Sequence, residues 1–81
     1  MKVKKADGRE EEFIKEKIVV ALVKNGSDAA TARDIANSVE KKFSNKAMVT
    51  SKEIRDEILQ RLQSKDMDRY NAWIAYEKRK R

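Results

Sequence analysis

The spacing of apolar residues along this chain changes near residue 14, where a helical period begins. Between residues 14 and 24 the apolar positions recur every three or four residues, as they do on one face of a helix. They are Ile14, Ile18, Val19, Ala21, Leu22 and Val23. Asn25 and Gly26 follow, and glycine is favoured after a helix because it adopts a positive φ easily. The pattern therefore predicts a helix that ends at Asn25-Gly26.

Three further apolar stripes with helical spacing follow along the chain. They lie in residues 29–43, 54–62 and 67–76. Thr50-x-x-Glu53 is a capping box, which marks the start of the helix that carries the middle stripe. The three aromatic residues of the last stripe are interpreted as packing residues. The stripes consist of Ala29, Ala32, Ile35, Ala36, Val39 and Phe43, then Ile54, Ile58, Leu59 and Leu62, then Met67, Tyr70, Trp73, Ile74 and Tyr76.

The segment before the first helix is typical of a β-hairpin. Residues 3–5 form its first strand and residues 10–13 its second, joined by Asp7-Gly8, a strong signal for a tight turn. Residues 47–49 form a third short extended piece. The expected fold is therefore α+β, with a small β-hairpin or three-stranded sheet capping a bundle of four helices. Without proline or a low-complexity linker, residues 1–81 are expected to form one domain.

The composition excludes several kinds of chemistry. The chain has no cysteine and no histidine, so disulfides, cysteine-containing zinc sites and histidine-based catalysis are excluded. Two glycines are too few for a glycine-rich phosphate loop, and the run of glutamates at residues 10–12 is more simply a solvated strand. We therefore expect no enzymatic activity. No apolar run approaches the roughly 20 residues that span a bilayer, and no signal peptide is visible, so we expect a cytoplasmic location.

The positive charge of the chain is concentrated at its two ends. The net charge is +6, but three lysines lie within residues 1–5 and four cations form residues 78–81. The body between them is thus nearly neutral. Either the ends are loose basic tails that bind nucleic acid, or the fold brings them together over one small anion.

Four segments of the sequence, in order, resemble the ATP-cone domain. They are VKKADGREEEF, KEKIVVALVKNG, TSKEIRDEIL and RYNAWIAYEK. This family is known as a regulatory module of ribonucleotide reductases and as part of the repressor of their genes. The resemblance covers nearly the whole chain and implies a small sheet on a helical bundle, with ATP or dATP bound between them. Mg²⁺ is an optional companion of that nucleotide.

The resemblance also implies which residues bind the nucleotide. The first strand provides Val3 and Lys5, with Lys4 as a further cation. The returning strand provides Glu11, the first helix Lys17, the third helix Ser51 and Arg55, and the last helix Lys78. The implied nucleotide-binding residues are therefore Val3, Lys4, Lys5, Glu11, Lys17, Ser51, Arg55 and Lys78. Glu11 would hold the ribose hydroxyls or order a lysine.

One position departs from the family pattern. Many members carry Lys, Arg or Asn just before the Asp-Gly turn, where this chain has Ala6. A phosphate-facing group is then missing there, and Arg9 is the residue that would compensate. The departure leaves the preference between ATP, dATP and a diphosphate open.

The expected function is that of a free-standing adenine-nucleotide-binding regulatory domain that acts on a partner chain or through self-association. Two alternatives stay open. The first is a small basic protein that binds nucleic acid or regulates transcription through its ends. The second is a helical protein-interaction module with a vestigial pocket, in which Val3 is core, Lys17 is surface charge and Ser51 is only part of a helix cap.

Overall fold

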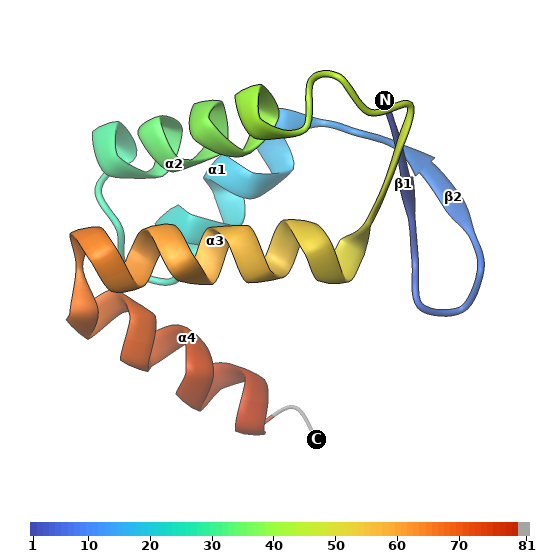
Figure 1. Ribbon diagram of the computed structural model, residues 1–81. Coiled ribbons are helices and arrows are strands. Elements are labelled where there is room, and N and C mark those ends of the chain that lie inside the picture. The colour runs from blue at the N-terminus through green and yellow to red at the C-terminus, as the bar shows by residue number, and fades with distance from the viewer. Residues whose placement is uncertain (80–81) are drawn as a thin grey trace.

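The structure, a computed structural model, describes residues 1–79. It is an α+β fold with a three-stranded mixed sheet and four helices, as the sequence predicts (Figure 1). The sheet lies at one end of the helical body. In chain order the elements are β1 (Lys2–Lys4), β2 (Glu10–Glu12), α1 (Lys15–Lys24), α2 (Ala29–Lys42), β3 (Met48–Thr50), α3 (Ser51–Lys65) and α4 (Met67–Arg79).

The sheet has the order β2-β1-β3, with β1 in the centre. β1 pairs antiparallel with β2 and parallel with β3, so that Val3 lies opposite both Glu11 and Val49. Compared with the sequence prediction, β1 is shifted by one residue toward the N-terminus, β3 by one residue toward the C-terminus, and β2 ends one residue earlier. The reason at β1 is that Lys5 belongs to the turn, since its N–H donates to the Arg9 carbonyl at 2.7 Å. Gly8 has a φ of +92° in this turn, as expected for Asp-Gly.

Local signals in the sequence explain where the helices begin and end. The Asp28 carboxylate accepts a hydrogen bond from the Thr31 N–H at 2.6 Å and caps α2. The capping box at the start of α3 is confirmed, because Thr50 and Glu53 each accept the other's backbone N–H at 3.0 Å. Gly26 follows α1 with a φ of +102°, which favours glycine there.

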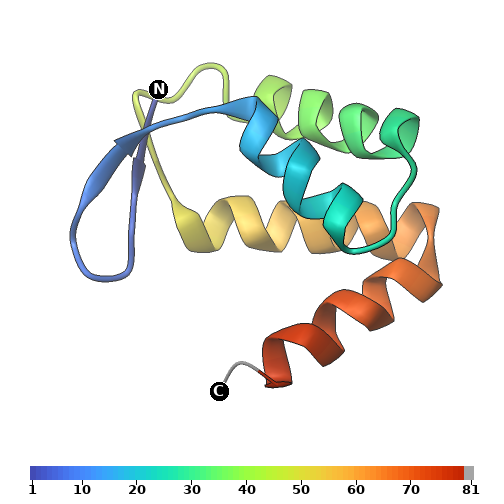
Figure 2. The ribbon, with the colours of Figure 1, turned by 180° about the vertical axis from the view of Figure 1, so that it is seen from behind.

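Helices α1, α2 and α3 lie around a common interior, with the sheet at one end (Figure 2). The core fills this interior and includes Val3 and Val49 of the sheet. It is built from the predicted apolar stripes, with Tyr70 and Trp73 of α4 packed against it as half-buried residues. Leu22, Ile35, Val39 and Leu62 are fully buried at its centre. No helix of the described part of the chain combines the length and the apolar character needed to cross a bilayer.

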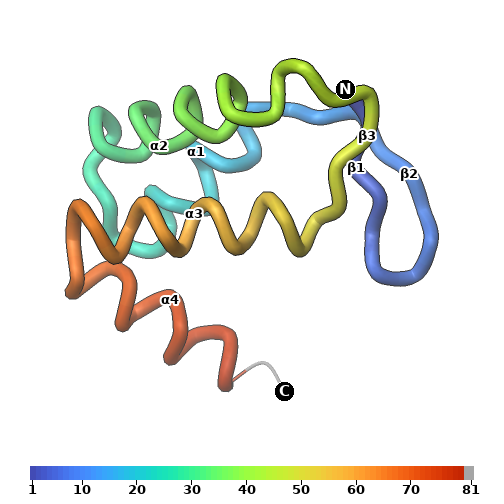
Figure 3. Tube along the Cα trace, viewed as in Figure 1, coloured from blue at the N-terminus to red at the C-terminus, as the bar shows by residue number. Residues whose placement is uncertain are grey.

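α4 differs from the other three helices in how it is packed. It leaves α3 at Asp66 and runs back toward the end of the molecule where the sheet lies (Figure 3). The expectation that all three aromatic residues of α4 are packing residues is wrong for Tyr76, which is 52% exposed. One side of α4 rests on α3 while Tyr76 lies away from the core, so helical spacing alone overestimates the buried face.

A buried carboxylate links α2 to α3. Glu57 is only 5% exposed, and its oxygens lie 2.9 Å from Lys42 Nζ and 2.7 Å from Arg61 Nε. Burial alone would raise the pKa of Glu57, but the hydrogen bonds from Lys42 and Arg61 outweigh it and lower the pKa. The carboxylate therefore stabilises the fold above its ordinary pKa, about 4.3, and loses this effect as the pH falls through the lower folded value.

Replacing Glu57 by glutamine is expected to reduce the free energy of unfolding at pH 7 by about 1–2 kcal/mol, because Lys42 and Arg61 then donate to a neutral amide instead of a carboxylate. The difference from the wild type should shrink as the pH falls through the lowered pKa of Glu57. Urea unfolding at pH 7 and pH 3 measures this. Glu40→Gln, which alters the exposed ion pair with Lys15, is the control and should change stability little. Equal losses for Glu57→Gln at both pH values would contradict the assignment.

Candidate functional site

A cavity of about 220 Å³ lies between the inner face of the hairpin and helices α1 and α3. Its walls come from both strands of the hairpin, the start of α1, the first two turns of α3 and one residue of α4. The lining residues are Val3, Lys5, Glu11, Glu12, Phe13, Ile14, Lys17, Ile18, Ser51, Ile54, Arg55, Ile58 and Trp73. Three cations and the carboxylate of Glu11 thus surround an apolar floor, while the Glu12 carboxylate pairs with Lys2 at 3.1 Å.

The hairpin provides an apolar contact and an ion pair. Side chains alternate along a strand, so Val3 and Lys5 lie on one face of β1 and its extension, and Lys4 on the other. Glu11, opposite Val3 in the register, lies on the same face, and its Oε1 is 3.4 Å from Lys5 Nζ. Lys4 is exposed and does not line the cavity. The structure therefore brings Val3, Lys5 and Glu11 together and leaves Lys4 outside.

The start of α1 forms the second wall. Ile14 is the N-cap residue of this helix and Ile18 lies one turn further along, so both border the cavity from the same helix face. Lys17 is exposed, and its side chain adds a cation beside this apolar wall. A lysine at this position extends into solvent unless an anion holds it, because its long side chain carries the charge away from the core.

The third wall is the first two turns of α3. Ser51, Ile54, Arg55 and Ile58 follow each other at three- and four-residue spacing and share one helix face. Ser51 is the first residue of α3, so the positive end of the helix dipole borders the cavity. This arrangement favours an anionic ligand group near Ser51 and Arg55.

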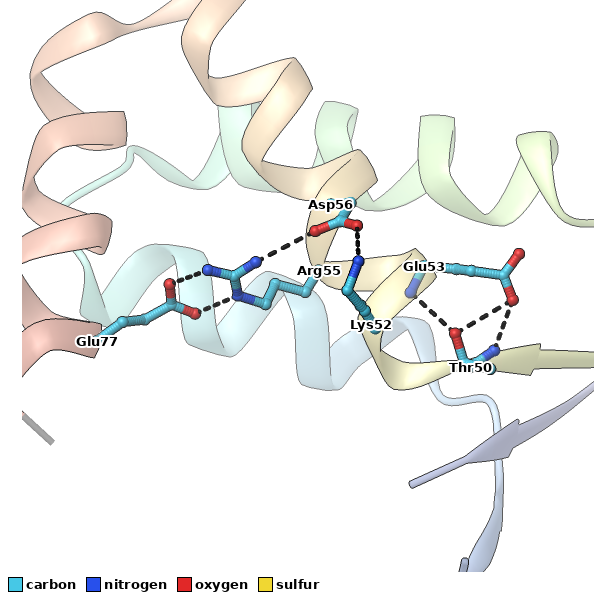
Figure 4. A network of polar contacts seen from close by, with 6 residues as sticks. All are labelled: Thr50, Lys52, Glu53, Arg55, Asp56 and Glu77. Carbon is cyan, nitrogen blue, oxygen red and sulfur yellow. Dashed lines mark hydrogen bonds and ion pairs between the residues drawn. The ribbon is translucent and has the colours of Figure 1, made fainter. Parts of the chain in front are cut away.

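Arg55 is already engaged by carboxylates. Its Nε and Nη2 donate to the two oxygens of Glu77 in α4 at 2.7 and 2.6 Å, and its Nη1 donates to Asp56 at 3.1 Å (Figure 4). The hydrogen bonds from Arg55 to Glu77 raise the pKa of the guanidinium further above its ordinary value. Arg55 is thus permanently cationic and joins α3 to α4 at the edge of the cavity.

The basic C-terminus does not reach this cavity within the described residues. Lys78 is exposed in the last turn of α4 and is absent from the lining. Residues 80 and 81, part of the cationic run in the sequence, lie outside the described part of the chain. Of the eight residues implied by the resemblance, six line the cavity, while Lys4 and Lys78 do not.

The apolar floor of the cavity was not identified from the sequence as part of a site. Phe13, Ile54, Ile58 and Trp73 have the same spacing as core residues, and from the sequence Trp73 is expected only to pack. A signal was present for two of them, because Ile54 and Ile58 share the helix face of Ser51 and Arg55. Glu12 is the remaining polar residue that was missed. Its hydrogen bond from Lys2 lowers its pKa, so it is ionised at neutral pH.

The chemistry of these residues fits a nucleotide. Isoleucine, phenylalanine and tryptophan side chains accommodate a flat base, whereas lysine, arginine and a helix N-terminus accommodate phosphate. Among residues 1–79 no group of three or more potential metal-binding side chains comes together. Any Mg²⁺ that accompanies the nucleotide would then be held mainly by phosphate oxygens and water, as this ion often is.

The fold and the cavity define a small α+β domain with a cavity between a sheet and a helical bundle, lined by cationic and apolar side chains. The chain belongs to the ATP cone domain family, whose family model matches residues 1–81. It is therefore a nucleotide-binding regulatory domain, and these 81 residues include no catalytic domain. A comparison with curated proteins finds no match.

Proposed function

We propose that this ATP cone binds ATP or dATP in the cavity between the hairpin, α1 and α3, and transmits the binding to a protein partner. One observation carries the proposal. Six residues that the family resemblance implies lie far apart in the sequence and line one cavity: Val3, Lys5, Glu11, Lys17, Ser51 and Arg55. A chance cluster of surface charges would not be expected to combine with an apolar floor in this way.

Each group has a role that its chemistry suggests. The base would lie on the apolar floor beside Val3 and Phe13. Glu11 would accept hydrogen bonds from the ribose hydroxyls, which is where ATP and dATP differ. Lys5, Lys17 and Arg55 would bind the phosphates through charge-assisted hydrogen bonds. Because Lys5 is paired with Glu11 in the structure, the carboxylate also orders this lysine.

The regulatory output requires that the nucleotide favours one conformation over another. A ligand shifts such an equilibrium only by the difference between its affinities for the two states. The cavity of about 220 Å³ is smaller than the roughly 300–1,000 Å³ of most ligand sites, so binding would widen it. Movement of the surrounding helices would then alter an outer surface that contacts another protein or a second copy of the chain.

The first test is a thermal scan with adenine nucleotides. A ligand that binds only the folded state at a hundredfold excess over Kd adds about 2.7 kcal/mol of stability. For a domain of this length, the melting temperature should rise by roughly 10 °C or more. The scan compares ATP, dATP and ADP with inorganic triphosphate at equal concentration. If millimolar nucleotides shift the melting temperature no more than triphosphate does, the nucleotide function is wrong.

A further inference from the structure

α4 is the least firmly anchored helix of the fold. No residue of Met67–Arg79 is fully buried, and a single extended residue, Asp66, joins the helix to α3. Its largest packing residue, Trp73, is itself imperfectly accommodated. The indole Nε1 of Trp73 is buried and has no hydrogen-bond partner among residues 1–79. A buried donor without a partner disfavours the conformation that contains it.

Among residues 1–79, two polar contacts, one near each end, hold α4 against the rest of the protein. Near its start, Asn25 Nδ2 donates to the Arg69 carbonyl at 2.9 Å, and Arg69 Nη1 donates to the Asn25 carbonyl at 3.1 Å. Near its end, Glu77 receives the two hydrogen bonds from Arg55. The contact at the start lies beside Asp66, the residue that connects α3 and α4. The contact at the end lies at the cavity.

The contact at the end of α4 uses the same guanidinium that lines the cavity. A guanidinium binds carboxylates and phosphates with the same two-pronged geometry. Three of the five N–H groups of Arg55 already donate to carboxylate oxygens, two to Glu77 and one to Asp56 (Figure 4). Glu77 occupies the edge of the guanidinium formed by Nε and Nη2, so a phosphate that binds this edge from the cavity competes with Glu77.

From this competition we infer that the ion pair of Glu77 with Arg55 is a latch, meaning a contact that holds the end of α4 on α3. The nucleotide opens it when its phosphate replaces Glu77 on Arg55. Release of Glu77 frees the C-terminal half of α4 to turn about Asp66, while the Asn25–Arg69 contact holds its start. There is space for this movement, because Trp73 also lines a second cavity of about 430 Å³ beside Ala21, Lys24, Asn25 and Tyr76. Turning α4 moves Trp73 and widens the nucleotide cavity. The inference rests on the proposed function and identifies α4 as the element that moves.

The latch is tested with Glu77→Gln, which keeps the shape of the side chain and removes its charge. Glu16→Gln is a matched control, because Glu16 forms the same kind of paired contact with Arg33, at 2.7 and 3.3 Å, and does not line the nucleotide cavity. Both variants remove one negative charge, so both should strengthen the general electrostatic attraction of an anion. Isothermal titration measures ATP affinity, and hydrogen exchange measures the opening of residues 67–79.

We expect Glu77→Gln to bind ATP about three- to tenfold more tightly than the wild type, since the ligand no longer displaces a carboxylate. Glu16→Gln should stay within about twofold. Without nucleotide, residues 67–79 should exchange faster in Glu77→Gln than in either other protein. In the wild type, ATP should accelerate exchange in the same residues.

Two results would overturn the latch while leaving the nucleotide site intact. The first is ATP binding by the wild type that Glu77→Gln tightens no more than Glu16→Gln does. The second is ATP binding that leaves exchange in residues 67–79 unchanged or slower. If none of the three proteins binds ATP, the proposed function is wrong and the latch with it.

Discussion

Replacing Leu62 by alanine is expected to lower the free energy of unfolding by about 3–4 kcal/mol. Leu62 is fully buried where α3 packs into the core. Truncation removes its apolar contacts and leaves a cavity that the surrounding helices only partly fill. Domains are commonly stable by only about 5–15 kcal/mol, so this is a large share of the total. The melting temperature, followed by circular dichroism, should fall by roughly 12 °C or more.

The neighbouring residue provides the control for this prediction. Gln63 is exposed on the same helix, and Gln63→Ala should change stability by about 0.5 kcal/mol or less. Leu59 is also buried but lies outside the main core cluster, so Leu59→Ala should cost less than Leu62→Ala. Equal losses for both leucines would mean that the core is not centred where α2 and α3 meet.

Much of the fold follows from local signals in the sequence. The Asp7-Gly8 turn, the Thr50–Glu53 capping box and Gly26 each determine the local backbone within a few residues, and all three occupy the predicted places. The position of Val49 in the sheet was less predictable from the sequence. β3 pairs with β1 only because α1 and α2 bring the chain back to the sheet. Such a non-local contact has little signal in the residues near it in the sequence.

The candidate site is harder to predict from sequence than the fold, because the same pattern serves core and cavity. Helical spacing identifies Ile54 and Trp73 as apolar but does not show that an opening lies beside them. Tertiary structure decides this. The alternation of side chains along a strand can be read from the sequence, and it places Lys4 and Lys5 on opposite faces of the sheet. The exposure of Lys78, in contrast, depends on the direction in which α4 leaves α3.

The contact between Arg55 and Glu77 illustrates the part that sequence could not provide. The two residues lie 22 positions apart, on helices whose relative direction is set by the single residue Asp66. Both read individually as surface charges on amphipathic helices. Only the packed arrangement shows that a candidate phosphate-binding residue is shared with another helix. In the proposed mechanism, regulation by the nucleotide and the stability of α4 are linked through this guanidinium.

The largest expected effect on binding comes from the cations of the cavity. Lys5→Ala and Lys17→Ala should each weaken ATP binding roughly tenfold or more, because each removes a charge-assisted contact with phosphate. Lys4→Ala, at the neighbouring position at the end of β1, is the matched control. It removes the same charge from the opposite face of the sheet and should change the affinity only slightly. Isothermal titration at two salt concentrations compares the three variants.

The response of Glu11 separates a nucleotide site from nucleic-acid binding by the basic ends. Glu11→Ala removes a negative charge, so simple attraction of any anion would strengthen. In the proposed site it should weaken ATP binding instead, because the ribose hydroxyls lose their acceptor and Lys5 loses the carboxylate that orders it.

If the chain instead binds DNA or RNA through its ends, deletion of residues 79–81 should have the largest effect, and binding should fall steeply with salt as counterions are released. Tighter ATP binding by Glu11→Ala, together with equal losses for Lys4→Ala and Lys5→Ala, would show that charge alone attracts the nucleotide and that the cavity does not hold it.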